Sequence, residues 1–222
     1  MTQKPKSPLF GYLHGFASSP QSKKGTHMEA AFKAHDLHLE LADLNVPSFA
    51  KLTFSGALSA VDQMVDNAQA PQTPWCLYGS SMGGYIAARW AQLHPERVQR
   101  LVLLCPGFNL SARWPELVGA EDWQRWQAQG WLNIPDANEV PTPVHWEFVE
   151  DSRRHPAWPE VPCPTLIIHG TRDETVPIDL SRQYAATRPH VTLVEVDDDH
   201  SLVQSLDLVA QRSMAFLGLT DA

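Results

Sequence analysis

The stretch that decides the fold is Trp75–Leu93, which reads WCLYGSSMGGYIAARWAQL. It begins with an apolar, strand-like run and ends in a run with the composition of a helix. Between them Gly79, Ser81 and Gly83 form the pattern G-x-S-x-G, which in a strand–turn–helix context is typical of a serine nucleophile. Glycine has no Cβ atom, so the strand and the helix can close tightly around the serine. Only Ser81 has a glycine two residues away on both sides, and Ser80 is therefore expected to be a packed neighbour.

Short apolar runs alternate with helix-like stretches along the rest of the chain. We expect strands at residues 9–14, 37–43, 75–78, 100–105, 165–169 and 191–196, and helices at 25–35, 54–68, 83–93, 178–187 and 201–217. Such alternation predicts βαβ units. The predicted fold is therefore α/β, with a mostly parallel, doubly wound sheet of about six strands that has helices on both faces.

The segment 107–162 breaks this alternation. It is rich in proline and tryptophan and contains no strand-like run. A long loop without secondary structure is rare inside a compact domain. We therefore expect an insertion with one or two short helices, one of them around residues 116–129, that forms a lid over the carboxyl edge of the sheet. The whole chain, 1–222, is predicted to be a single domain.

Composition excludes several classes of partner. The formal net charge of −8 disfavours nucleic acid and anionic membranes, since both attract a surplus of Lys and Arg. No apolar run is long enough to span a bilayer, and no secretory signal is visible. The cysteines, Cys76, Cys105 and Cys163, lie in apolar runs and are expected to be reduced core thiols of a cytoplasmic protein. The oligomeric state stays open.

The loop after the first predicted strand reads HGFASS, residues 14–19. Backbone N–H groups near a nucleophile stabilise the negative charge that develops on a substrate oxygen. The Phe16 N–H is expected to be one such donor, with Ala17 as the alternative, and the Met82 N–H at the start of the helix is expected to be the other. His14 is expected to support this loop rather than to act as the general base.

The acid and the base follow the last two strands. Asp173, in HGTRDETVP, is the expected acid, with Glu174 and Asp179 as alternatives. His200, in DDDH, is the expected general base, because it is the histidine that lies in the loop directly after the last strand. The chain order serine, acid, histidine is that of one known triad scaffold.

Four segments in this order resemble the α/β-hydrolase superfamily, and within it the small serine esterases: HGFASSP, YGSSMGG, IHGTRDETVP and DDDH. The resemblance covers residues 9–217. It implies a parallel sheet whose strand order reverses between the strands ending at His14 and Tyr78, where crevices form. The chain departs from the family in two ways. Its first predicted strand is the one that carries HGF, so the usual N-terminal hairpin is expected to be missing, and it has HGF where some lipases have HGGG.

The resemblance implies a serine hydrolase that cleaves carboxylic esters through an acyl-enzyme. The compact size of the chain and its proline-rich insertion favour short acyl groups over long triglycerides. The alternative is a thioesterase or acyl-protein deacylase with the same triad; a non-catalytic binding module is less favoured, because the triad residues are intact. No cofactor is expected. A metal site at Asp197–Asp199 with His200 is disfavoured, since no distant ligand supports it. The acidic run is expected to stabilise a His200 imidazolium and to favour activity at neutral to alkaline pH.

Overall fold

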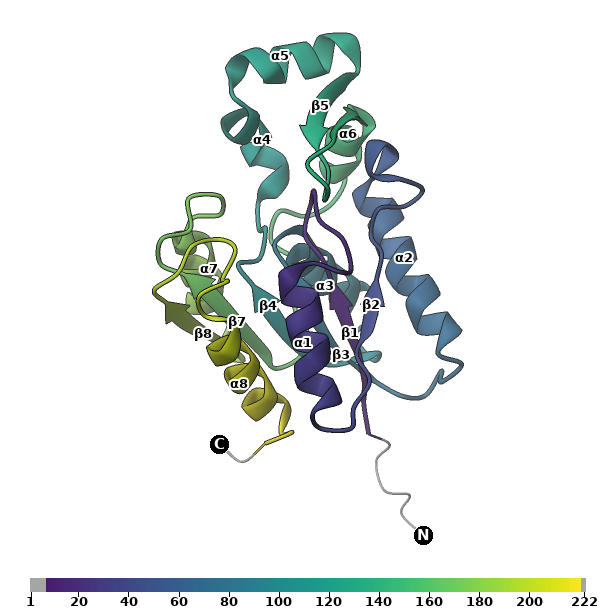
Figure 1. Cartoon of the computed structure of the whole chain (residues 1–222), viewed down its shortest axis with the longest axis vertical. Helices are drawn as coiled ribbons and strands as arrows, with labels where there is room; N and C mark the ends of the chain where they lie inside the picture. The colour runs from purple at the N-terminus through teal and green to yellow at the C-terminus, as the bar shows by residue number, and fades with distance from the viewer. Residues whose placement is uncertain (1–6, 221–222) are drawn as a thin grey trace.

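Six parallel strands form the central sheet of the computed structural model, which describes residues 7–220 (Figure 1). In the order β2-β1-β3-β4-β7-β8, they are Glu40–Ala42, Leu9–Leu13, Trp75–Ser80, Val98–Leu104, Thr165–Gly170 and Val191–Val196. Every neighbouring pair is parallel. The predicted α/β class, strand number and reversal of order beside β1 are confirmed, and in the described residues no strand precedes β1.

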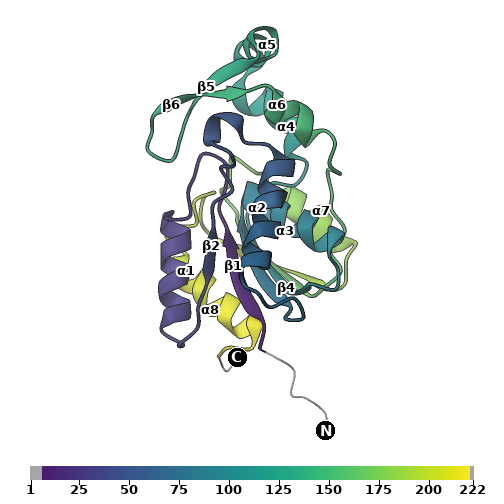
Figure 2. The same ribbon diagram turned by 90° about the vertical axis from the view of Figure 1, so that its right-hand side faces the viewer.

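Helices cover both faces of the sheet (Figure 2). One face carries α1, Lys23–Lys33, and α8, Leu206–Leu217. The other carries α2, Phe54–Asn67, α3, Met82–Leu93, and α7, Ile178–Ala186. Because the sheet is covered on both sides, every residue of the central strand β3 is buried. This is why the central strands appear in the sequence as continuous apolar runs.

Helix α2 shows how the local sequence sets an element. Thr53 caps it, and its Oγ1 accepts a hydrogen bond from the Gly56 N–H at 2.9 Å. Leu58, Val61 and Val65 recur at helical spacing and are buried against the sheet. Within the described residues, no helix is both long and apolar enough to cross a bilayer.

The segment between β4 and β7 lies beyond the carboxyl ends of the strands (Figure 1). We call residues 107–162 the insertion. It contains α4, Leu110–Val118, α5, Ala120–Gln129, β5, Trp131–Pro135, β6, Pro141–His145, and α6, Glu147–Ser152, with the short 3-10 helix η1, Phe49–Lys51, beside β6. The two helices α4 and α5 meet at Gly119, whose φ of 82° favours glycine.

The prediction that the insertion contains no strand was wrong. β5 and β6 form an antiparallel hairpin, in which Leu132 pairs with Val144 and Asn133 with Pro143. Because this ribbon has two strands, each has a free edge, where the missing N–H of a proline costs little. Leu132 and Val144 are its two buried residues. With so few buried positions, apolar and polar residues hardly alternate in the sequence of the hairpin.

The insertion shares its core with the rest of the molecule. Trp126 and Phe148 are fully buried in the same apolar cluster as Ile86 of α3. Two polar contacts add to this packing. Tyr85 Oη donates to the Pro156 carbonyl at 2.7 Å, and the buried Asp151 carboxylate accepts from the N–H at 2.8 Å and the Oγ at 2.7 Å of Ser55 in α2.

Candidate active site

Ser81 occupies the sharp bend between β3 and α3. Its φ of 54° and ψ of −118° lie in a region that residues other than glycine rarely adopt. The bend is held by hydrogen bonds from the Ser81 N–H to the Leu104 carbonyl at 2.9 Å and from the Gly107 N–H to the Ser81 carbonyl at 2.8 Å. A Cβ atom on Gly79 or on Gly83 would overlap backbone atoms. These two glycines therefore allow the strand, the helix and the loop after β1 to meet at Ser81.

The loop after β1 lies against Ser81. A Cβ atom on Gly15 would lie 3.3 Å from Ser81 Cβ and 3.9 Å from its Oγ. His14 Nδ1 donates to the Gly15 carbonyl at 2.8 Å, and its Nε2 accepts from the Leu44 N–H at 3.0 Å. Burial lowers the pKa of His14, so the ring is neutral. His14 thus supports the loop that carries Phe16.

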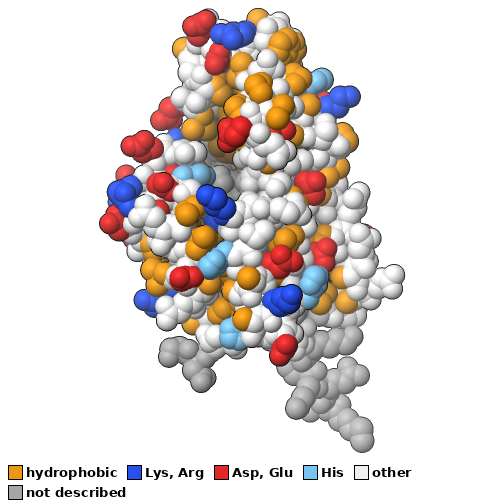
Figure 3. All heavy atoms as spheres, viewed as in Figure 1, with side chains coloured by type: hydrophobic (Ala, Val, Ile, Leu, Met, Phe, Trp, Pro, Cys, Tyr) orange, Lys and Arg blue, Asp and Glu red, His pale blue; other side chains and the backbone are white. Residues whose placement is uncertain are grey.

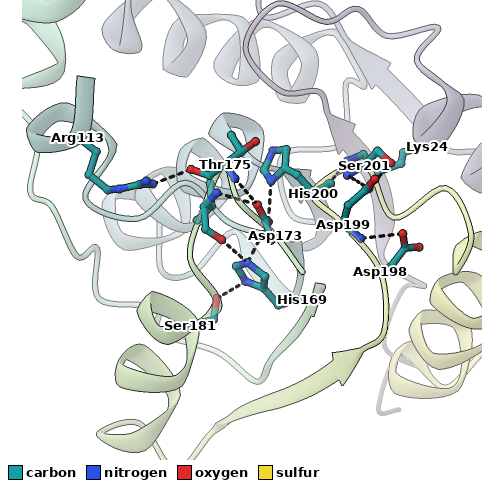
Figure 4. A network of polar contacts seen from close by, with 11 residues as sticks. Lys24, Arg113, His169, Asp173, Thr175, Ser181, Asp198, Asp199, His200 and Ser201 are labelled. Atoms are coloured by element: carbon teal, nitrogen blue, oxygen red, sulfur yellow. Dashed lines mark hydrogen bonds and ion pairs between the residues drawn. The ribbon is translucent and has the colours of Figure 1, made fainter. Parts of the chain in front are cut away.

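Asp173 and His200 lie together at the carboxyl ends of β7 and β8 (Figure 4). His200 Nδ1 donates to Asp173 Oδ2 at 2.7 Å. The other carboxylate oxygen, Oδ1, accepts the N–H groups of Thr175 at 2.9 Å and Val176 at 2.7 Å. The Asp173 carboxylate is completely buried. It therefore fixes the ring of His200 in the tautomer that leaves Nε2 free to accept a proton.

A second histidine, His169 at the end of β7, contacts the same carboxylate. Its Nε2 donates to the Val176 carbonyl at 2.8 Å and lies 3.1 Å from Asp173 Oδ2, while its Nδ1 accepts from Ser181 Oγ at 2.7 Å. Because Nε2 donates and Nδ1 accepts, the ring proton of His169 lies on Nε2. Burial alone would raise the pKa of Asp173, but the hydrogen bonds from His169 and His200 outweigh it and hold the pKa well below its usual range. Sequence reasoning missed His169, because its contact with Asp173 depends on the loop after β7.

The loop that carries His200 contacts the helix that follows β1. β8 is the edge strand, separated from β3 by β4 and β7, so a residue directly above β8 would lie far from Ser81. However, Lys24 Nζ, in the helix that follows β1, donates to the His200 carbonyl at 3.2 Å. In the described part of the chain no hydrogen bond joins Ser81 Oγ to His200. Such contacts are often long until a substrate binds.

In the described residues the acidic run before His200 makes no hydrogen bond or ion pair with the imidazole, whose carboxylate partner is Asp173. The expectation that the run stabilises an imidazolium stays a prediction. Asp197 pairs with Arg172 at 2.7 Å. Asp198 is fully buried and accepts the N–H groups of Asp199 and Ser205, each at 2.8 Å. These carboxylates therefore shape the loop, and the carboxylate at the ring comes from the loop after β7.

The alternative acids lie elsewhere. Glu174 is exposed and lines a pocket of about 550 Å³ next to His200. Asp179 pairs with Arg182 at 2.9 Å on the surface of α7. The pocket is lined by charged and hydroxyl side chains, namely Arg172, Glu174, Thr175, Asp199, His200 and Ser201. Figure 3 shows that the surface is hollowed between the insertion and the body below it.

One group of described side chains, Cys105, His169 and Asp173, places its donor atoms within 4.8 Å of one another, as metal ligands would be. The group does not fit a metal ion. Burial raises the pKa of the Cys105 thiol, which opposes the loss of the proton that metal binding requires. Both ring nitrogens of His169 already have hydrogen-bond partners.

Comparisons with known proteins agree with this fold. The chain is 26% identical over 154 residues to the pimeloyl-[acyl-carrier protein] methyl ester esterase of Chromobacterium violaceum, covering 55% of this chain and 61% of that protein. It is 27% identical over 116 residues to human monoacylglycerol lipase ABHD6, covering 44% and 34%. The chain thus spans less than two thirds of the length of these curated relatives.

Two solved structures share the architecture over nearly the whole chain. Alpha/beta hydrolase domain-containing protein 10 from mouse has a TM-score of 0.77 and 22% identity, covering 97% of this chain and 92% of that one. Est1E from Butyrivibrio proteoclasticus has a TM-score of 0.78 and 20% identity, covering 97% and 88%. The sequence profile of the uncharacterised protein family UPF0227 matches residues 9–218. The chain therefore belongs to this family and has the α/β-hydrolase fold.

Proposed function

We propose that this protein is a serine hydrolase that cleaves carboxylic esters, with Ser81 as nucleophile, His200 as general base and Asp173 as the acid that orients it. The observation that carries the proposal is the 2.7 Å hydrogen bond from His200 Nδ1 to the buried Asp173 carboxylate. This pair occurs in the same molecule as a serine in the strained conformation typical of a nucleophile elbow. Serine in this arrangement needs an adjacent base to become nucleophilic.

The reaction would run in two halves. His200 Nε2 takes the proton from Ser81 Oγ as the oxygen attacks the ester carbonyl, and then gives that proton to the leaving alcohol. Water, activated by the same imidazole, releases the acid from the acyl-enzyme. Throughout, Asp173 remains ionised and stabilises the imidazolium, which agrees with its depressed pKa.

The oxyanion would be stabilised by two backbone N–H groups. Met82 is the first residue of α3, where N–H groups have no partner within the helix. Phe16 lies in the loop that contacts Ser81 through Gly15. Its ring packs between Trp114 and Phe148 of the insertion, at centroid distances of 5.0 Å each. The insertion would therefore help to place the Phe16 N–H, in addition to acting as a lid.

The charged and hydroxyl side chains that line the pocket next to His200 favour an ester with a polar alcohol. The short acyl group is proposed from the small size of the chain and its proline-rich insertion. The names of the relatives, which include esterases and a lipase, favour ester hydrolysis in general. The net charge of −8 favours a small substrate over nucleic acid.

The test is hydrolysis of nitrophenyl esters with acyl chains of increasing length, by the wild type, Ser81→Ala and Ser80→Ala. Ser80 is the matched control, since it is a neighbouring serine that is 1% exposed. We expect the wild type and Ser80→Ala to prefer short chains, and Ser81→Ala to lose activity by about 10³-fold or more.

Labelling with a fluorophosphonate probe should follow the same pattern. Full activity in Ser81→Ala would refute the mechanism. A wild type that neither hydrolyses esters nor reacts with the probe would favour a binding module instead. Faster turnover of matched thioesters would reassign the substrate class and keep the triad.

A further inference from the structure

The proposed general base lies in a loop, not in a helix or strand. Residues 197–205 connect β8 to α8, and the structure assigns them turns and bends. The loop is fixed at its start, where the Arg172 N–H donates to the Asp198 carbonyl at 3.0 Å, and at its end, where Ser205 N–H donates to Asp198 Oδ2 at 2.8 Å. These contacts hold the flanks of the loop. The turn at His200 is closed by hydrogen bonds from the Ser201 N–H to Asp199 Oδ1 at 2.8 Å and from the Leu202 N–H to the Asp199 carbonyl at 3.3 Å. All of these contacts lie within the loops after β7 and β8.

A side chain from a distant part of the chain reaches the backbone of His200. Lys24 Nζ, in the first turn of α1, donates to the carbonyl of His200 at 3.2 Å (Figure 4). The side chain of His200 is held separately, by the hydrogen bond from its imidazole to Asp173. Within residues 7–220, the hydrogen bond from Lys24 is the one that reaches His200 from outside the loops after β7 and β8.

We propose that Lys24 is a positioning residue for the general base, and that its hydrogen bond to the His200 carbonyl holds the imidazole over Ser81. The proposal rests on the proposed function, because it assigns Lys24 a role through His200. Lys24 would not touch the substrate.

The backbone around Lys24 is held in place by a helix cap and by close packing. Ser22 caps α1, with its Oγ accepting from the Gly25 N–H at 3.2 Å. A Cβ atom on Gly25 would overlap the Pro20 carbonyl and lie 3.0 Å from the Tyr12 ring, so this turn lies directly against β1. The stretch from residue 14 to residue 24 therefore carries both the loop beside Ser81 and the lysine that contacts the base. One short segment would set the distance between the oxyanion donor and the base.

The charges around Lys24 suit this role. Burial lowers the pKa of its ammonium, and the negative charges of Asp173, Asp198 and Asp199 oppose that decrease. An ammonium group has three N–H donors, so one can bind the carbonyl while the positive charge faces the carboxylates. Lys24 is only partly exposed. The structure shows that its head group points toward the base loop (Figure 4).

The test compares Lys24→Met, Lys24→Arg and Lys23→Met. Lys23 is the matched control, because it is the adjacent lysine and is exposed. We expect Lys24→Met to lower kcat about 10- to 100-fold through misplacement of the imidazole, while KM changes by less than about twofold. Lys24→Arg should restore part of the loss, since its guanidinium can also donate to a carbonyl. Lys23→Met should behave like the wild type.

A second readout is independent of catalysis. The proton in the hydrogen bond from His200 to Asp173 is expected to give a downfield NMR resonance, assigned by its loss in His200→Gln. In Lys24→Met this resonance should shift or broaden, while the melting temperature stays close to that of the wild type. Wild-type kcat and an unchanged resonance in Lys24→Met would overturn the proposal, and so would an equal loss of activity in Lys23→Met. If the wild type has no esterase activity, the proposed function fails, and the resonance still decides whether Lys24 positions His200.

Discussion

Several hydrogen bonds converge on the carboxylate of Asp173. It accepts from the N–H groups of Thr175 and Val176, from His200 and from His169, at distances between 2.7 and 3.1 Å. A buried carboxylate is stable in its ionised form when several donors surround it. At the scale of the single residue, these hydrogen bonds would allow the proposed acid both to orient the His200 imidazole and to contribute to folding.

We predict that Asp173→Asn lowers kcat by about 10⁴-fold, because an amide can hold the imidazole in the wrong tautomer. The variant should also be less stable than the wild type at neutral pH. The folded-state pKa of Asp173 is depressed, so its contribution is complete above the unfolded-state pKa of about 3.9 and is lost as the pH falls toward the folded-state value. The difference in the free energy of unfolding should therefore shrink below about pH 4.

Urea denaturation of both proteins between neutral and acid pH checks this. Asp179→Asn is the control, because it removes a carboxylate that is 70% exposed and paired with Arg182 on the surface. Its effect on stability should be small. A difference between the wild type and Asp173→Asn that stays constant down to acid pH would contradict the prediction.

At the scale of the element, the insertion behaves as a packed layer. Trp114 and Phe148 contact each other at a centroid distance of 5.2 Å, and both contact Phe16 of the loop beside Ser81. Aromatic pairs of this kind contribute stability beyond the area that they bury. The core of the insertion thus packs against the loop beside Ser81. A lid that moved freely would not have these contacts.

We predict that Phe148→Ala lowers the free energy of unfolding by about 3–5 kcal/mol, because the side chain is fully buried and its removal leaves a cavity. Trp131→Ala, in the hairpin of the same insertion, should cost less than about 1 kcal/mol, because Trp131 is 41% exposed. Chemical denaturation measures both. Equal losses in the two variants would show that burial does not decide the stability of the insertion.

At the scale of the whole molecule, the insertion and the sheet are joined by one apolar cluster that contains Val61 of α2, Ile86 of α3 and Trp126 of α5. We therefore propose that residues 1–222 form a single domain and predict one cooperative thermal transition, with equal calorimetric and van't Hoff enthalpies. Differential scanning calorimetry checks this. Two separate transitions, one of which disappears in Phe148→Ala, would mean that the insertion unfolds on its own.

The alternation of apolar strands and amphipathic helices was enough to predict the sheet, its direction and its layers, because each signal is local and repeats with a fixed period. The same holds for the bend at Ser81, where the backbone conformation requires glycines at fixed positions. Asp173 and His200 could also be predicted as site residues. Each follows a predicted strand, and the carboxyl ends of parallel strands meet at one edge of the sheet.

Other features depended on contacts between distant residues. The hairpin β5–β6 has a weak pattern because only two of its residues are buried, and β6 packs against η1, which is distant in the sequence. Lys24 and His200 are 176 positions apart, and His169 reaches Asp173 only through the turn of its loop. Periodicity describes which face of an element is buried but not which side chain from another element lies against it. Only the tertiary structure decided those partners.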